Sequence, residues 1–146
     1  MRYNTSKRDP IKNSFIMPNE IFRLGLSEGA IAVYAYLLYC EDRGTYQCYP
    51  SYTTIAAAIG KSKNSIRKYV AELVAKRLIE AEHTTVILKD GRKHNGSLKY
   101  TILPIDKAVR YHDEMQMRQL KIEEAKREAE KRLAEYDRKH PKPVSL

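Results

Sequence analysis

The sequence predicts a mainly α-helical domain with a small β-hairpin, followed by a long helix that stands apart from it. Residues 51–78 hold two short runs of helically spaced apolar residues, separated by a glycine. Residues 79–103 contain two β-prone segments around two turn-forming dipeptides. Residues 105–140 contain neither glycine nor proline and are highly charged. With 146 residues and 42% hydrophobic content, the chain supports one core of ordinary size and an appendage.

Four segments follow from these patterns. Residues 1–13 are polar and basic without a helical or strand period, so we expect a flexible N-terminal arm. Residues 14–103 form the predicted domain. Residues 104–140 form the long charged helix, and residues 141–146 are a tail that begins where Pro141 and Pro143 end the helical pattern.

The first part of the domain is predicted to hold a strand, a short turn and a core helix. Residues 14–17 read as a short strand, and Pro18 begins a brief helical turn. Ser27 is placed to cap a helix whose apolar residues recur at helical spacing over residues 30–40. We expect Gly44 to stop this helix, and the chain then to cross to the next helix without regular structure.

Two short helices are predicted to meet across a tight turn in residues 51–78. Ile55 and Ile59 lie four residues apart on one face of the first helix, and Gly60 tolerates a left-handed turn. Ser62 is placed to cap the second helix. The apolar residues that this helix is expected to bury are Ile66, Tyr69 or Val70, Leu73 and Val74.

The opposite face of the second helix is polar and basic. In a helix-turn-helix, the start of the second helix meets base edges in the DNA major groove. Arg67 suits bidentate bonding to guanine and Asn64 to adenine, while Lys61 and Lys68 suit phosphates. The alternative is a plain helical hairpin with a solvated charged face. The predicted recognition residues are Lys61, Ser62, Lys63, Asn64, Ser65, Arg67 and Lys68.

A basic hairpin follows directly, which favours DNA binding over the plain helical hairpin. Residues 79–88 and 97–103 are its predicted strands. Asp90-Gly91 and Asn95-Gly96 both form turns, so the register of the tip stays open. A hairpin in this position is the layout of a winged helix. Its predicted DNA contacts, to phosphates or in the minor groove, are Lys89, Arg92, Lys93 and His94.

The net charge is concentrated on the same segment. The chain carries a formal net charge of +9, and residues 61–103 hold ten basic and four acidic residues, a net of +6. Clustered positive charge beside a foldable motif favours a phosphate backbone as partner, although a basic solvated surface is the alternative. The arm of residues 1–13 either lies in a minor groove or is a frayed terminus.

Much of the chain also resembles a known family. Residues 15–103 resemble the winged helix-turn-helix DNA-binding proteins of bacterial mobile elements, similar to the N-terminal domain of plasmid replication initiators and to bacterial winged-helix transcriptional regulators. This likeness implies a cytoplasmic bacterial protein that binds double-stranded DNA, either as a regulator or as a replication initiator or origin-binding accessory protein. The segments that carry it are Phe15–Phe22, Leu26-Ser27, Tyr49–Ser51, Ile55-Ala56, Gly60–Ile66 and Leu78-Ile79.

The long helix raises the question of a homodimer. Its apolar seam approximates alternating spacings of three and four but is poor in branched aliphatics. Residues 105–136 therefore form a dimeric coiled coil, a solvated single helix, or a helix whose first turns, with Ile105, Ala108 and Val109, pack back on the domain. If the coil forms, two recognition helices are presented to an inverted repeat. The seam is broken at Arg118 and Gln119, and it runs through Met115, Ile122, Ala125, Ala129, Leu133 or Arg132, and Tyr136.

Other functional classes find little support. No paired-carboxylate, nucleophile or phosphate-loop motif indicates an enzyme, and Glu72, Glu80 and Glu82 read as solvent-facing positions. Cys40 and Cys48 are too few for a zinc site and are expected to be reduced. We therefore expect no cofactor, no metal and no membrane contact, in a cytoplasmic protein. A protein-interaction adaptor built on a winged helix is the remaining alternative.

Overall fold

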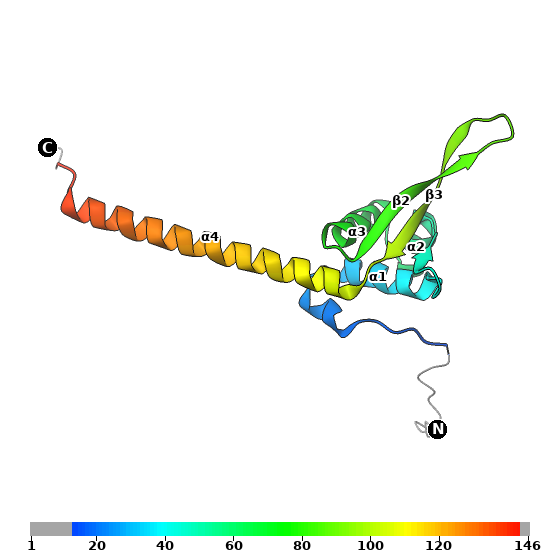
Figure 1. The fold of residues 1–146 in the computed structure, drawn as a ribbon, viewed down its shortest axis with the longest axis horizontal. Coiled ribbons are helices and arrows are strands. Elements are labelled where there is room, and N and C mark those ends of the chain that lie inside the picture. Colours follow the sequence, from blue (N-terminus) through cyan, green and yellow to red (C-terminus); the bar gives the residue numbers. More distant parts are fainter. Residues whose placement is uncertain (1–12, 144–146) are drawn as a thin grey trace, which may run out of the picture. The chain divides into compact units, whose positions relative to one another are not determined.

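The computed structural model describes residues 13–143. The chain divides between Val109 and Arg110 into two compact units. The first unit begins with a 3₁₀ helix, η2 (Asn19–Arg23), and three α-helices, α1 (Glu28–Cys40), α2 (Tyr52–Ile59) and α3 (Lys63–Ala75). A three-stranded antiparallel sheet completes it (Figure 1). The predicted arm of residues 1–13 lies almost wholly outside the described residues.

The sheet has the strand order β1-β3-β2. Strands β2 (Ile79–Ile87) and β3 (Lys93–Ile102) form a long hairpin whose outer half projects beyond the three helices (Figure 1). The short strand β1 (Gln47–Cys48) pairs only with the inner end of β3, Gln47 opposite Thr101 and Cys48 opposite Tyr100. Three helices with a protruding hairpin make up a winged-helix domain, as predicted.

One apolar core joins these elements. Each helix contributes side chains that are almost fully buried, among them Leu37 of α1, Ile55 of α2 and Ile66 of α3. Tyr100 of β3 is buried beside them. Burial of such aliphatic side chains stabilises the fold by about 1.5 to 3 kcal/mol each. The remaining buried members are Ile21, Leu24, Ala30, Val33, Tyr34, Cys48, Val70, Leu73, Leu78, Ile79 and Ala108.

Several predictions for the first half of the domain were wrong. Residues 14–17 form no strand. Helix α1 ends at Cys40, the last residue of its predicted run, and the next residue, Glu41, has an extended backbone. Gly44 therefore does not stop the helix; the amides of Gly44 and Thr45 donate to the Asp42 carboxylate at 2.7 Å and 3.3 Å in a turn that follows it. Strand β1 was not predicted, because a strand of two residues is too short to show an alternating apolar and polar pattern in the sequence.

The second unit consists mainly of helix α4 (Ile105–Lys139). Both ends of this helix lie within one residue of the predicted ends, 104 and 140. Its first residues still belong to the first unit, where Ala108 is buried and Ile105 and Val109 pack against the core. At about 1.5 Å per residue, the 35 residues of α4 span about 52 Å. From Asp113 to Lys139 every side chain is exposed, so no core within this unit holds the helix.

Candidate nucleic-acid interface

The turn between α2 and α3 is set by two serine caps and one glycine. The Ser51 hydroxyl accepts a hydrogen bond from the Thr54 amide at 3.1 Å, and the Ser62 hydroxyl accepts one from the Ser65 amide at 3.2 Å. Gly60 has a φ of 71°, and its amide donates to the Ala56 carbonyl at 2.9 Å. Because only glycine adopts this backbone at little cost, the turn is specified locally.

Helix α3 is amphipathic in the predicted sense. Ile66, Val70 and Leu73 are buried, whereas Val74 is 38% exposed and was wrongly placed in the core. Tyr69 is only partly buried; its ring lies over Gly29, where a Cβ would come within 2.0 Å of it. Glycine at this position therefore lets α1 and α3 pack closely.

The predicted recognition residues gather around the start of α3, but they are not equivalent. Two of them are engaged with each other, because the Ser62 hydroxyl donates to the Ser65 hydroxyl at 3.0 Å, and Ser65 is partly buried. The others are exposed and leave their charged or amide groups open to solvent. These are Lys61, Lys63, Asn64, Arg67 and Lys68.

Tyr52 contacts the predicted recognition residue Arg67, and the sequence did not predict this contact. The Arg67 guanidinium carbon lies 6.0 Å from the centre of the Tyr52 ring, which is the range of a cation–π contact. Tyr52 is the first residue of α2 and Arg67 lies in the second turn of α3, so their proximity depends on how the two helices cross. The contact restricts the guanidinium of the residue best suited to bind guanine.

The second half of α3 is tied to the segment between η2 and α1. The Ser27 hydroxyl donates a 2.6 Å hydrogen bond to the Glu72 carboxylate. The Lys76 ammonium donates to the carbonyls of Leu24 at 3.0 Å and Gly25 at 2.9 Å. Glu72 is therefore a structural contact rather than the free solvent-facing carboxylate that we predicted. These bonds restrain α3 relative to α1.

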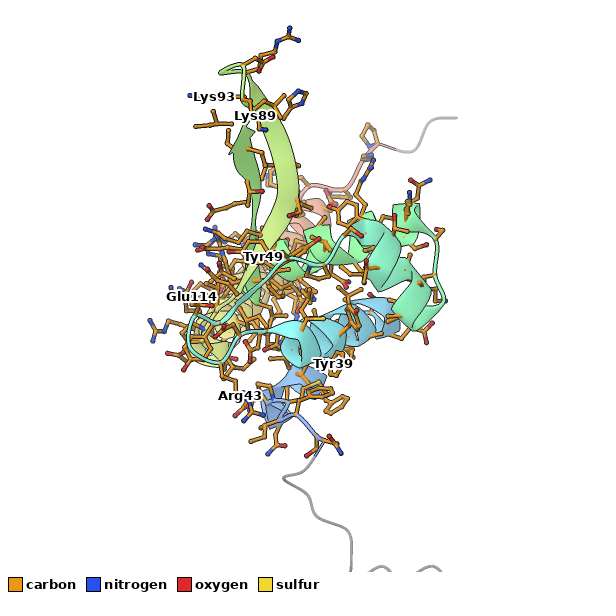
Figure 2. All side chains as sticks on the ribbon, turned by 90° about the vertical axis from the view of Figure 1, so that its right-hand side faces the viewer. Tyr39, Arg43, Tyr49, Lys89, Lys93 and Glu114 are labelled. Atoms are coloured by element: carbon orange, nitrogen blue, oxygen red, sulfur yellow. The ribbon has the colours of Figure 1, made fainter. Side chains whose placement is uncertain are left out.

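The tip of the wing is a tight turn centred on Asp90 and Gly91. The Leu88 amide donates to the Arg92 carbonyl and the Gly91 amide to the Leu88 carbonyl, both at 2.9 Å. Arg92 pairs with Asp90 through its Nε at 3.0 Å, so part of the predicted positive charge is neutralised within the tip. Lys89, Lys93 and His94 are exposed, and Figure 2 shows Lys89 and Lys93 at the outer end of the hairpin.

The other turn-forming dipeptide, Asn95-Gly96, lies within strand β3 and not at the tip. The strand register shifts between His83 and Thr85, and the Thr84 hydroxyl donates to the Ser97 carbonyl at 2.7 Å. A Cβ on Gly96 would lie 2.3 Å from the Thr84 hydroxyl. Gly96 is therefore required by close approach at a β-bulge, which leaves Asp90-Gly91 as the tip turn.

Neither cysteine is in a disulfide. Cys48 is buried, and this burial raises the pKa of its thiol to about 12. Its thiol contacts the Leu37 carbonyl at 3.7 Å, so it packs as a small apolar residue. Within residues 13–143 no group of three or more His, Cys, Asp or Glu could hold a metal ion. No helix in this range is both long and apolar enough to span a bilayer.

Comparisons with known proteins match part of this domain. Residues 24–79 match a helix-turn-helix domain family, which covers α1 to α3 and stops at the first residue of the wing. This confirms the helix-turn-helix part of the predicted likeness, whereas similarity to plasmid replication initiators or mobile-element proteins is not shown and stays a prediction. Curated protein sequences give no match.

Solved structures provide more distant likenesses. A possible transcriptional regulator from Methanosarcina mazei Go1 is 13% identical, with a TM-score of 0.47 over 80% of this chain and 97% of that one. The YusO protein from Bacillus subtilis is 15% identical, with a TM-score of 0.40 over 82% of this chain and 79% of that one. A mutant of MepR from S. aureus is 14% identical, with a TM-score of 0.35 over 80% and 79%.

Proposed function

We propose that this protein binds double-stranded DNA in a sequence-specific manner, with the start of α3 in the major groove. The observation that carries the proposal is the exposed face of α3, where Lys63, Asn64, Arg67 and Lys68 stand on a helix whose other face is buried. A rigid helix with amide and guanidinium groups at its start can read base edges. Exposed lysines beside them neutralise phosphates.

The wing contributes charge rather than sequence readout in this proposal. Lys89 and Lys93 contact phosphates, or enter the minor groove, at the outer end of the hairpin. Arg92 contributes less than its charge suggests because Asp90 already pairs with it. His94, whose side chain is exposed, serves as a hydrogen-bond partner.

The proposal is tested by titrating the full chain into labelled random and selected duplexes at increasing NaCl. Affinity is expected to fall linearly on a double logarithmic plot, because each neutralised phosphate contributes about 0.9 to the slope. Replacing Lys89 and Lys93 together with alanine should lower the slope. Replacement of Lys126 and Lys131 together with alanine, at two exposed lysines on α4, is the matched control. Binding to duplex DNA that does not respond to salt, or no binding, would favour the protein-interaction adaptor instead.

We further propose that the DNA sites belong to promoters, so that the protein is a transcriptional regulator, with replication initiation as the alternative. The helix-turn-helix match of residues 24–79 supports a DNA-binding module that both activities can use. Selection and sequencing of source-genome fragments bound by the full chain separates them. Sites over promoters support regulation, whereas a cluster of sites at a replication origin would overturn it in favour of initiation.

A homodimer through α4 is the assembly that we propose for this function. Along the helix, Met115, Ile122, Leu133 and Tyr136 are 40–62% exposed within the chain, and a second copy would bury them in a seam. Sedimentation equilibrium of the full chain should give twice the monomer mass. Ile122→Lys combined with Leu133→Lys should give the monomer, while a wild-type monomer at all concentrations would exclude this assembly.

A further inference from the structure

The domain contains a cavity that the DNA-binding proposal does not use. It encloses about 440 Å³ and is lined by apolar side chains from α1, from the segment before η2 and from the junction of β3 with α4. Ligand pockets of small organic molecules have volumes of about 300 to 1,000 Å³ and mostly apolar walls. The walls include Tyr34, Leu38, Tyr46, Ile102 and Ile105.

One ionisable side chain, Glu41, belongs to this lining. Its Oε2 atom is buried and has no hydrogen-bond partner among the described residues. Burial raises the pKa of this carboxyl, and the neighbouring Arg43 counteracts that rise. A buried carboxylate oxygen without a partner costs free energy that a donor placed opposite it would recover.

Arg43 does not supply that donor. Its side chain is exposed and belongs to an adjoining hollow of about 690 Å³ that also reaches Glu41, Tyr39 and Phe15. Figure 2 shows Tyr39 and Arg43 at the end of the domain away from Lys89 and Lys93 of the wing. The adjoining hollow is therefore separate from the outer part of the wing, and Glu41, which lines both, is the group that distinguishes the cavity from a plain apolar hollow.

We propose that this cavity binds a small organic amine with an aromatic or aliphatic body. The apolar body would displace water from the walls formed by Tyr34, Leu38 and Ile102. Its ammonium group would donate a charge-assisted hydrogen bond to the carboxylate of Glu41, which lines the cavity. Ile16 and Tyr46 also line the cavity and are 89% and 58% exposed.

A ligand in the cavity would contact residues at the base of the wing. Ile102, which lines the cavity, is the last residue of wing strand β3. Its amide donates a hydrogen bond to the carbonyl of Tyr46, another lining residue, at 2.9 Å. Another wall, Ile105, is the first residue of α4. A ligand that shifts the packing of Ile102 would change the base of the wing, and a resulting change of DNA affinity rests on the proposed function.

The test uses phenethylamine, which is cationic at neutral pH, and phenethyl alcohol, which has nearly the same shape without the charge. Each is titrated into the full chain without DNA, and backbone amide shifts are followed by NMR. We expect the amine to shift the amides of Leu38, Tyr46 and Ile102 and to bind more tightly than the alcohol. Because no DNA is present, this outcome does not depend on the proposed function.

Two variants and one control make the test decisive. Glu41→Gln preserves the side-chain shape and should weaken amine binding by about tenfold or more, since hydrogen bonds to charged groups carry at least that factor, while alcohol binding stays the same. Leu38→Trp should block both probes by filling the cavity. Glu80→Gln, at an exposed carboxylate of β2, should change nothing. Amide spectra of all variants report whether they remain folded.

Several results would overturn the proposal. These are equal affinity for amine and alcohol, unchanged amine affinity in folded Glu41→Gln, and shifts that map to exposed acidic residues instead of the cavity. A final titration with labelled DNA then separates the two proposals. If the amine binds the cavity but the chain does not bind DNA, the ligand site stands and the proposed function fails.

Discussion

Helix α3 and the tip of the wing both present basic side chains, but the chain holds them in different ways. The exposed face of α3 is backed by Ile66 and Leu73, both fully buried. The tip of the wing is backed by nothing comparable, since Val86 and Ile87 beside it are 48% and 70% exposed. Helix α3 is thus fixed by the core, whereas the tip is held by backbone hydrogen bonds and the exposed Arg92–Asp90 pair.

This difference separates two kinds of DNA contact. Base readout requires donors placed to within a fraction of an ångström, which a packed helix provides. Phosphate contacts tolerate variation in position because they depend mainly on charge. We therefore expect substitutions in α3 to change stability and sequence preference, and substitutions in the tip to change affinity alike for all sequences.

The largest expected effect comes from truncating isoleucine in the two regions. Ile66→Ala should lower the free energy of unfolding by about 2 to 5 kcal/mol, because it leaves a cavity in the core. Ile87→Ala, the same truncation near the tip, should change it by less than about 0.5 kcal/mol. Urea denaturation of the full chain measures both. Similar losses at the two positions would mean that the tip is packed as firmly as α3.

Arg67→Ala is expected to affect recognition more than stability. It should weaken binding to the selected site by about 1 to 3 kcal/mol and relax preference at one base pair. Lys93→Ala should weaken binding to selected and random duplexes equally. Tyr52→Leu should shift preference in the same direction as Arg67→Ala but less, since a cation–π contact at an exposed site contributes about 0.5 to 1 kcal/mol.

Competition binding with a library of single base-pair changes measures these preferences. If Arg67→Ala reduced affinity for random and selected duplexes by the same factor, Arg67 would be a phosphate contact. The division of roles between α3 and the tip would then no longer hold.

Removing the cap of α3 tests how locally the helix is specified. Ser62→Ala loses the hydrogen bond from the Ser65 amide and should lower the free energy of unfolding by about 0.5 to 2 kcal/mol. Ser62→Asp retains a capping oxygen and should recover most of that loss. Thermal denaturation followed by circular dichroism is the measurement, and an unchanged melting temperature for Ser62→Ala would show that tertiary contacts alone hold the helix start.

The smallest expected effect concerns the ion pair at the tip. Asp90→Asn frees Arg92, so affinity for all duplexes should rise slightly and the salt slope should steepen by at most about 0.9. Stability should change little, because an exposed pair contributes about 0 to 1 kcal/mol. Glu128→Gln on α4 is the control for removing one negative charge. A slope that does not change would leave Arg92 outside the interface.

Capping residues and turn-forming glycines in the sequence were sufficient to predict most of the helices and the hairpin. Ser27 and Ser62 act as the predicted caps, Ser51 caps α2 in the same way, and Gly60 forms the left-handed turn. These features depend on the backbone needs of a few neighbouring residues, so they can be read from the chain itself. The long helix could likewise be predicted, because it lacks glycine and proline and is rich in strong helix formers with opposite charges four residues apart.

The tertiary structure decided which of these elements meet. Strand β1 exists because β3 lies beside it, the Arg67 contact with Tyr52 depends on the crossing of α2 and α3, and Gly96 serves a bulge instead of a turn. The cavity with Glu41 is formed by segments that are more than sixty residues apart in the chain. Such contacts join residues with no shared local period, so only the packing of the core brings them together.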